Sequence, residues 1–237
     1  MRRAIVMLLV VSLAFAGLAS PIKSMMAMRN STITEATEIP YASEVEWIYV
    51  DGPAYCDTGL AFTPSSNYVM QLDFQYPDGW IVNSHIFGVR AGSSPYFDVN
   101  VGTSFLKVRT TPNRDATYGT MDRRRHSITV DAVNDHFILD DDERSLVYPI
   151  SSYQSSNHVI LFYFTLSAVN VKMRVYSFKV WNREGILVKD LVPYRVGIGT
   201  EAVGCFFDKA NPNGGVNGDG LFFITGTATI EVGRDKK

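Results

Sequence analysis

The sequence predicts an all-β protein, built as an antiparallel β-sandwich in a single domain. Apolar and polar residues alternate over 69–76 and 222–232, which is the period of strands that bury one face. Between such runs lie clusters of Gly, Pro, Asn, Asp and Ser, which favour turns. These clusters occur at 77–79, 91–95, 140–143 and 211–220. No stretch of ten or more residues keeps a helical period without Gly or Pro, so antiparallel sheets are expected.

The first 19 residues have the parts of a secretory signal peptide. Arg2 and Arg3 give a positively charged start, residues 4–16 are apolar, and small residues precede a cleavage site after Ala19. A membrane anchor is the alternative, but the apolar stretch is shorter than the ~20 residues that a span needs. We therefore expect an exported protein, extracellular, at the cell surface or periplasmic, with no membrane span after cleavage.

The rest of the chain divides into a linker, one domain and a short tail. Residues 20–44 show neither a helical nor a strand period and are rich in Ser, Thr and Met, which is typical of a linker. Residues 45–233 form an unbroken series of strand and turn signals without an internal repeat. We expect one β-sandwich over this range, followed by a C-terminal tail at 234–237.

The charge balance bears on the partners. The chain has 22 Lys and Arg against 24 Asp and Glu, a formal net charge of -2. Nucleic acids and anionic membranes are bound by clustered positive surfaces. We expect neither to be the main partner.

The alternation also predicts which strand residues face the core. The inward residues of 69–76 are Met70, Leu72, Phe74 and Tyr76, and those of 222–232 are Phe222, Ile224, Ala228, Ile230 and Val232. Residues 158–166 are apolar at successive positions, which is typical of a central strand covered on both faces.

Residues 173–194 predict a hairpin with its turn at 182–185, where Gly185 can take a left-handed conformation. The predicted inward residues are Tyr176, Phe178 and Val180 on the first strand, and Leu187 and Leu191 on the second. Pro193 is expected to end the pairing, because proline has no N–H to donate.

Several segments resemble one family. RVYSFKVWNREGILVKDLVP, followed by VGCFFDKANPNGG and GLFFITG, is similar to the C-terminal part of bacterial and phage concanavalin A-like (laminin G-like) jelly-roll domains. EWIYVDGPAYCDTGLAFTPSSNYVMQLDFQ resembles the opening of such domains, and HIFGVRAGSS and RRHSITVD their middle. The resemblance covers nearly all of 45–233 and implies a concanavalin A-like sandwich. The family includes lectins, glucanases and protein-binding modules, so the fold does not choose among them.

Cys56 and Cys205 are the two cysteines of the chain. A disulfide between them would close most of the domain and could contribute about 4–5 kcal/mol in the loop-entropy model. Two buried thiols are the alternative, since each cysteine stands at an apolar strand position. The resemblance implies that the chain ends pair within one sheet, which would bring the two residues towards each other.

Catalytic motifs are absent from the sequence. Glucanases of the concanavalin A-like fold typically carry E-x-D-x-x-E on one strand, which directs three carboxylates into a cleft, and this spacing does not occur here. Residues 140–143 are four consecutive acids at an expected hairpin turn, so they predict a solvated turn. His126, His136 and His158 lack metal-ligand spacing and are interpreted as surface or half-buried side chains.

No cofactor is expected, although the Gly-rich segment 208–219 gathers oxygen donors that could hold calcium. These donors are Asp208, Asn211, Asn213, Asn217 and Asp219. Their spacing is not that of an EF-hand, and a hairpin loop explains the same composition.

Sugar recognition needs exposed aromatic rings beside fixed polar groups. Trp80 is the best candidate because it follows the turn at 77–79, and Arg90, Tyr96 and Asp98 flank the next turn. Trp181, beside the 182–185 turn, is second. The sequence therefore favours an exported, non-catalytic module that binds a glycan or another extracellular ligand at a loop edge or concave surface. A glycoside hydrolase of the same fold and a protein-binding adhesion module are the alternatives.

Overall fold

The computed structural model describes residues 42–62, 68–79, 84–90, 96–102, 105–111, 114–147, 150, 157–162, 170–197, 203–215 and 219–237. The predicted signal peptide and most of the predicted linker lie outside these residues. All regular structure in the described ranges is β-strand, which confirms the all-β prediction. None of the described residues belongs to a helix long and apolar enough to cross a membrane.

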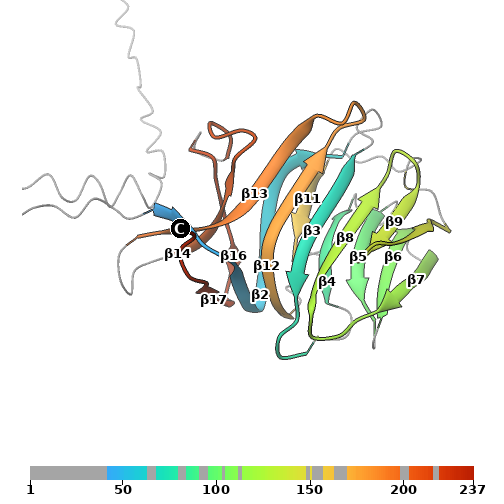
Figure 1. Cartoon of the computed structure of the whole chain (residues 1–237), viewed down its shortest axis with the longest axis horizontal. Coiled ribbons are helices and arrows are strands. Elements are labelled where there is room, and N and C mark those ends of the chain that lie inside the picture. The colour runs from blue at the N-terminus through green and yellow to red at the C-terminus, as the bar shows by residue number, and fades with distance from the viewer. Residues whose placement is uncertain are drawn as a thin grey trace, which may run out of the picture. The chain divides into compact units, whose positions relative to one another are not determined.

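The strands range from two residues in β16 to 14 in β2 and follow one another along the described chain (Figure 1). In order they are β1 (Ala42–Glu44), β2 (Ile48–Ala61), β3 (Val69–Gln75), β4 (His85–Arg90), β5 (Tyr96–Val101), β6 (Phe105–Thr111), β7 (Arg114–Thr120), β8 (Arg125–Asp131), β9 (His136–Leu139), β10 (Asp142–Ser145), β11 (His158–Leu161), β12 (Asn170–Trp181), β13 (Leu187–Val196), β14 (Val203–Asp208), β15 (Leu221–Phe223), β16 (Thr225–Gly226) and β17 (Thr229–Val232).

The strands pair antiparallel in two layers. The first sheet runs β10–β9–β8–β3–β12, and the free edge of β12 is shared between β2 and β13. The second sheet runs β11–β4–β5–β6–β7. The long strand β2 belongs to both layers, because its first half pairs with β12 and its second half with β11. The described strands therefore form an antiparallel β-sandwich, as the sequence predicts.

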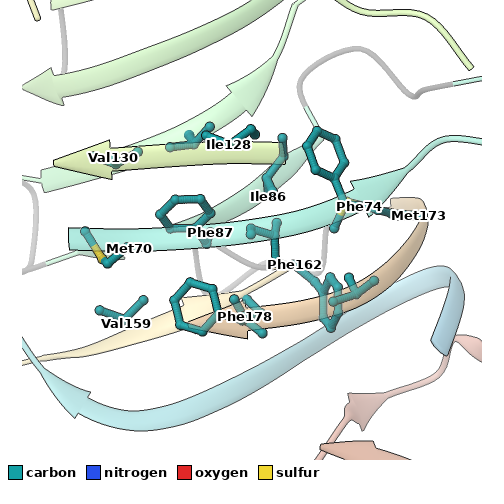
Figure 2. Close-up of a cluster of buried hydrophobic side chains, with 14 of the residues drawn as sticks. Met70, Phe74, Ile86, Phe87, Ile128, Val130, Val159, Phe162, Met173 and Phe178 are labelled. Carbon is teal, nitrogen blue, oxygen red and sulfur yellow. The ribbon is translucent and has the colours of Figure 1, made fainter. Parts of the chain in front are cut away.

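The core lies between the two sheets. The ring of Phe87 on β4 meets that of Phe178 on β12, with centroids 5.6 Å apart. Figure 2 shows side chains from β3, β8 and β12 packed against others from β4 and β11. Burial of each such large apolar side chain stabilises the fold by roughly 1.5–3 kcal/mol.

The alternation correctly predicts β3. The four inward residues expected on 69–76 are all fully buried. The predicted turn at 140–143 is also present, since Asp140 and Asp141 have positive φ angles and connect β9 to β10 as a two-residue loop. Of the predicted strand 158–166, the structure describes β11, in which Val159 and Leu161 are fully buried and Ile160 is half-buried.

The predicted strand 222–232 is not continuous. It is divided into β15, β16 and β17, which pair with β14 and β2. Gly226 causes the break: its φ is +141°, and an added Cβ would lie 2.2 Å from the carbonyl oxygen of Pro53. The alternation in the sequence continues across this bend and therefore conceals it.

The hairpin is present, with Gly185 at φ +76°, but two inward assignments are wrong. A β-bulge between Val175 and Ser177 shifts the register against β3, and Tyr176 is directed outward and half-exposed. Leu187 is 36% exposed instead of meeting the core. Phe178, Val180 and Leu191 are buried, as predicted.

Pro193 does not end its strand. Pairing of β13 with β12 stops at Leu191, but β13 continues to Val196 beside β14. Pro193 lies opposite Phe206, and its carbonyl oxygen accepts a hydrogen bond from Val45 N–H. A proline in a strand is tolerated where its missing N–H leaves no ladder bond unmade.

The two ends of the described chain lie together. β17 pairs with β2, and Val45 forms a β-bridge with Asp235. Lys236 N–H donates to the carbonyl oxygen of Glu44 over 2.9 Å. Residues at both ends of the domain thus belong to one hydrogen-bonded layer, as the resemblance implies.

Candidate functional site

Polar side chains gather on the outer face of the second sheet, the face turned away from the core. On β5, Phe97, Val99 and Val101 are core residues. Because successive side chains of a strand point to opposite faces, Asp98 and Asn100 point outward. They are nevertheless buried, with exposed fractions of 0% and 2%.

Asp98 is the centre of a polar trio, in which Asn100 is hydrogen-bonded to it and His85 lies within ion-pair distance. Asn100 Nδ2 donates to Asp98 Oδ1 at 2.8 Å and lies 3.3 Å from Oδ2. His85 Nδ1, from β4, lies 3.3 Å from Asp98 Oδ2. A buried carboxylate is stable only when such partners compensate its lost hydration. Asp98 is therefore held in one orientation.

The side-chain amide of Asn100 has one hydrogen-bond acceptor that no described residue satisfies. Its Oδ1 is buried and accepts no hydrogen bond from any described residue. A buried acceptor without a donor costs about 1–3 kcal/mol. A hydroxyl or amine donor brought by a ligand would satisfy this oxygen, so Asn100 points to a binding role.

Gly88 on β4 provides the space for this trio. It lies opposite Asp98, and an added Cβ would be 2.8 Å from Asp98 Cβ and 2.5 Å from the carbonyl oxygen of Phe97. Only glycine leaves room there. The motif HIFGVR therefore combines His85 with the space that the Asp98 side chain needs.

β6 adds an aromatic ring and two cations to the same face. Leu106 and Val108 are buried in the core, so Phe105, Lys107 and Arg109 point outward, and all three are half-buried. Lys107 Nζ lies 5.6 Å from the centroid of the Phe105 ring.

The pairing of β5 with β6 brings these groups to the trio. Lys107 lies directly opposite Asn100, and Arg109 lies directly opposite Asp98. Directly opposed residues of antiparallel strands have Cβ atoms roughly 4.5–5.5 Å apart. We call His85, Asp98, Asn100, Phe105, Lys107 and Arg109 the β4–β6 site.

Of the ligand-binding residues predicted from sequence, Arg90, Tyr96 and Asp98 lie on the paired strands β4 and β5. Arg90 and Tyr96 are paired positions at the β4–β5 connection, close to Asp98 along the same strands, and their side chains are outside the described part. Trp80 also lies outside the described residues. Trp181 is half-exposed at the end of β12, on the first sheet, and is not part of the site.

Five residues of the site were missed by the sequence reasoning: His85, Asn100, Phe105, Lys107 and Arg109. The segment FLKVRT at 105–110 carries a signal that could have found three of them, because its alternation separates Leu106 and Val108 from the outward residues. The contribution of Asn100 depends on the partner strand and leaves no such signal.

The histidines and the acidic turn have structural roles. His126 is 2% exposed, so its assignment to the surface or half-buried class was wrong. Its Nδ1 lies 2.6 Å from Asp140 and its Nε2 3.2 Å from Asp122. His136 pairs with Glu143 and His158 with Asp57, both at exposed positions. Asp140 and Glu143 thus connect the β9–β10 hairpin to His126 of β8 and to His136 of β9.

Cys56 and Cys205 are free thiols and fully buried. Both lie against β15: Cys205 is opposite Phe223, and Cys56 Sγ lies 4.0 Å from the carbonyl oxygen of Phe222. Burial in an apolar environment raises the pKa of both thiols, that of Cys205 to about 12.

Both carboxylates considered for calcium, those of Asp208 and Asp219, already accept hydrogen bonds. Asp208 Oδ2 accepts a 3.0 Å bond from Lys189 Nζ, and its Oδ1 accepts from the N–H groups of Asp190 and Ala210. Asp219 Oδ1 accepts from Leu221 N–H. In the described ranges no three His, Cys, Asp or Glu side chains are arranged to hold a metal ion. Asn217 lies outside these ranges.

The chain has few detectable similarities to known proteins. No family model matches the chain. No curated protein matches it either. One solved structure, described as "Cell entry of botulinum neurotoxin type C is dependent upon interaction with two ganglioside molecules", aligns with a TM-score of 0.33 and 8% identity over 62% of this chain. The aligned region spans 58% of that chain, and a likeness this distant carries no argument about fold family or function.

Proposed function

We propose that the chain is an exported, non-catalytic binding module that recognises a glycan at the β4–β6 site, on a sandwich of the concanavalin A-like type. The buried acceptor of Asn100, held beside Asp98 and next to the half-buried ring of Phe105, is the observation that carries this proposal. Export is supported by the N-terminal sequence, and the sandwich type by the resemblance of 45–233.

A sugar presents two kinds of surface, and the site offers a partner for each. The apolar face of a pyranose ring can pack on the ring of Phe105. Its hydroxyl groups can donate to Asp98 and to Asn100 Oδ1, and each hydrogen bond to a charged group contributes about 1.5–3 kcal/mol. Because Asp98 and Asn100 are already oriented by each other, little side-chain entropy is lost on binding.

Binding is favoured over glycoside cleavage by the number of carboxylates. Cleavage needs a pair of them, as acid and as base or nucleophile. Among the described side chains of β4, β5 and β6, Asp98 is the one carboxylate, and it faces His85 and Asn100. Release of reducing ends from a glycan would support the hydrolase alternative instead.

The experiment is a glycan array probed with the full chain, followed by calorimetry on the best ligand. Asn100→Ala should weaken binding about tenfold or more, because it removes the acceptor and one partner of Asp98. Phe105→Ala should weaken it by a similar factor through lost ring packing. Tyr194→Ala, which removes a half-exposed ring on β13 whose centroid lies 5.2 Å from that of Phe207, is the matched control and should bind normally.

Thermal unfolding of each variant separates lost binding from lost folding. The Phe105 side chain is half-exposed, so that variant should remain folded even if Asn100→Ala does not. A chain that binds no glycan on the array, or a Phe105→Ala variant with unchanged affinity, would remove the β4–β6 site from consideration.

A further inference from the structure

Three neighbouring strands at one side of the first sheet carry an outward row of side chains. β17, β2 and β12 lie side by side (Figure 1), and Tyr49 on β2 is directly opposite both Glu231 on β17 and Arg174 on β12. Ile48 and Val50 belong to the core, so Tyr49 points away from it. Directly opposed residues of antiparallel strands share a face. Glu231 and Arg174 therefore lie outward on the two strands that flank β2, each strand roughly 4.8 Å from it.

Four charged side chains lie on the outer face of β17 and of the halves of β2 and β12 that pair with each other. Two of them balance each other, since Lys172 Nζ lies 3.6 Å from Asp51 Oδ2. Glu231 is exposed, and neither it nor Arg174 has an ion-pair partner in the described part of the chain. One acid and one base thus remain, placed symmetrically about β2.

Arg174 is held by aromatic rings and not by an acid. Its guanidinium carbon lies 4.4 Å from the centroid of the Trp47 ring and 6.0 Å from that of Tyr49. Its Nε is buried and donates to no described residue, which is costly for a charged group. A guanidinium can form two parallel hydrogen bonds with one carboxylate. Arg174 therefore has donors that a carboxylate from another chain would satisfy.

The composition of this face is that of a protein–protein contact. Trp, Tyr and Arg are enriched in such interfaces and contribute most often to their affinity. All three types meet here, with Trp47 and Arg174 half-buried beside Tyr49.

We infer that this face binds a second copy of the chain, about a two-fold axis that runs parallel to the strands and over β2. Such an axis exchanges the two sides of β2, so Glu231 of the second copy meets Arg174, and Arg174 of the second copy meets Glu231. Both pairs form at once, as a two-fold interface requires. Tyr49 lies next to the axis and meets its own counterpart. Asp51 also lies near the axis, where Lys172 of its own chain neutralises it.

The dimer has a consequence for ligand binding, and this consequence rests on the proposed function. The first sheets meet in the dimer, so the two β4–β6 sites, on the outer faces of the second sheets, point away from each other. A dimer with two such sites can bind two glycans at once and gains avidity on a surface that displays many copies.

Sedimentation velocity of the full chain over a concentration series tests the dimer. The unaltered chain should show an equilibrium between monomer and dimer. Arg174→Glu and Glu231→Arg should each raise the dissociation constant at least about tenfold, because each places like charges against each other twice. Two controls make the same charge changes elsewhere and should leave the constant within about twofold. They are Lys179→Glu, half-exposed on the other half of β12, and Glu184→Arg, exposed in the hairpin turn.

A mixture of the two variants tests the two-fold arrangement. When Arg174→Glu and Glu231→Arg chains are mixed in equal amounts, both ion pairs of the mixed dimer join opposite charges, so dimers should form again. Dimers that do not return in the mixture would overturn the two-fold pairing.

Thermal unfolding of each variant separates lost association from lost folding. Glu231 is exposed, so Glu231→Arg should remain folded even if Arg174→Glu does not. A chain that is monomeric at every concentration, or a dimer that Glu231→Arg leaves unchanged, would overturn the inference. Neither result depends on a glycan, so the dimer and the proposed function can fail separately.

Discussion

Asn100 donates a hydrogen bond of 2.8 Å to Asp98, two residues earlier on the same strand, and both side chains are buried on the face away from the core. The pair can form because residues two apart on a strand point the same way. It can be accommodated because Gly88, on the adjacent strand, has no side chain.

The Gly88→Ala variant should therefore be destabilised by about 2 kcal/mol or more, since the new Cβ would overlap the Phe97 carbonyl and the Asp98 side chain. Gly185→Ala is the control: no atom lies within 4 Å of its added Cβ, and only the positive φ, worth about 1 kcal/mol, is strained. Chemical denaturation measures both. Equal losses in the two variants would contradict the packing argument.

Neighbouring aromatic residues on β12 should differ sharply in their importance. Phe178→Ala removes a fully buried ring that packs on Phe87, and should cost about 3–5 kcal/mol. Tyr176→Ala removes a half-exposed ring that lies under Arg125 and a hydroxyl group that donates to Gln75 Oε1, and should cost about 1 kcal/mol. The free energies of unfolding of the two variants, measured by denaturant titration, test whether the β-bulge directs Tyr176 outward. Similar losses would place Tyr176 in the core after all.

Both cysteines should resist thiol reagents in the folded protein. Burial raises the pKa of Cys205 to about 12 and that of Cys56 further, so neither is a thiolate at pH 8. An Ellman assay should find no rapid reaction under native conditions and two thiols in denaturant. Rapid native reaction would contradict the burial, and an absence of thiols in denaturant would show that Cys56 and Cys205 form a disulfide.

Glu44 should make folding stability depend on pH in the acid range. Burial alone would raise its pKa, but hydrogen bonds and charge attraction from Lys209 and Lys236 outweigh this and lower it. A lowered pKa means that the stabilisation is complete above the unfolded value of about 4.3 and is lost as pH falls through the folded value.

Thermal unfolding between pH 7 and pH 3 measures the contribution of Glu44. Glu44→Gln should remove part of the acid-induced loss of stability, and Glu46→Gln, an exposed neighbour, should not. Identical pH profiles for Glu44→Gln and the unaltered chain would refute the role of this carboxylate in joining the chain ends.

The buried ion pair of Lys189 and Asp208 should be costly to break from one side. Asp208→Ala leaves Lys189 buried without its carboxylate and should destabilise by about 3–5 kcal/mol. The double variant Lys189→Met, Asp208→Leu should recover much of this loss, because neither charge is left alone. A loss in the double variant as large as in the single one would contradict this account.

The hydrogen bonds of Asp208 also predict how the protein responds to calcium. Asp208 already accepts bonds from Lys189 and from two backbone N–H groups, so the ion would have to displace them. Neither calcium nor a chelator should shift the melting temperature by more than a degree or so. A concentration-dependent stabilisation by calcium would show that the 208–219 segment binds it.

Local chemistry explains what the sequence predicted well. Strand β3, the Asp140–Asp141 turn and the Gly185 turn each depend on residues within a few positions of one another, through alternation or through backbone preference. The bulge at Tyr176 could not be predicted this way, because it depends on how β12 is matched to β3. Gly226 likewise bends the chain only because Pro53 approaches it.

The candidate site shows the same division. Asp98 became a candidate from the sequence because it follows the predicted turn at 91–95, but nothing in the sequence relates Asn100 to Lys107 or Asp98 to Arg109. Those relations come from the register of β5 against β6. By itself the sequence determined the all-β class, the turns at 77–79, 140–143 and 182–185, and which strand residues are apolar, since these follow from neighbours along the chain. The tertiary structure alone decided which polar residues share a face, because strand pairing joins residues that the chain keeps apart.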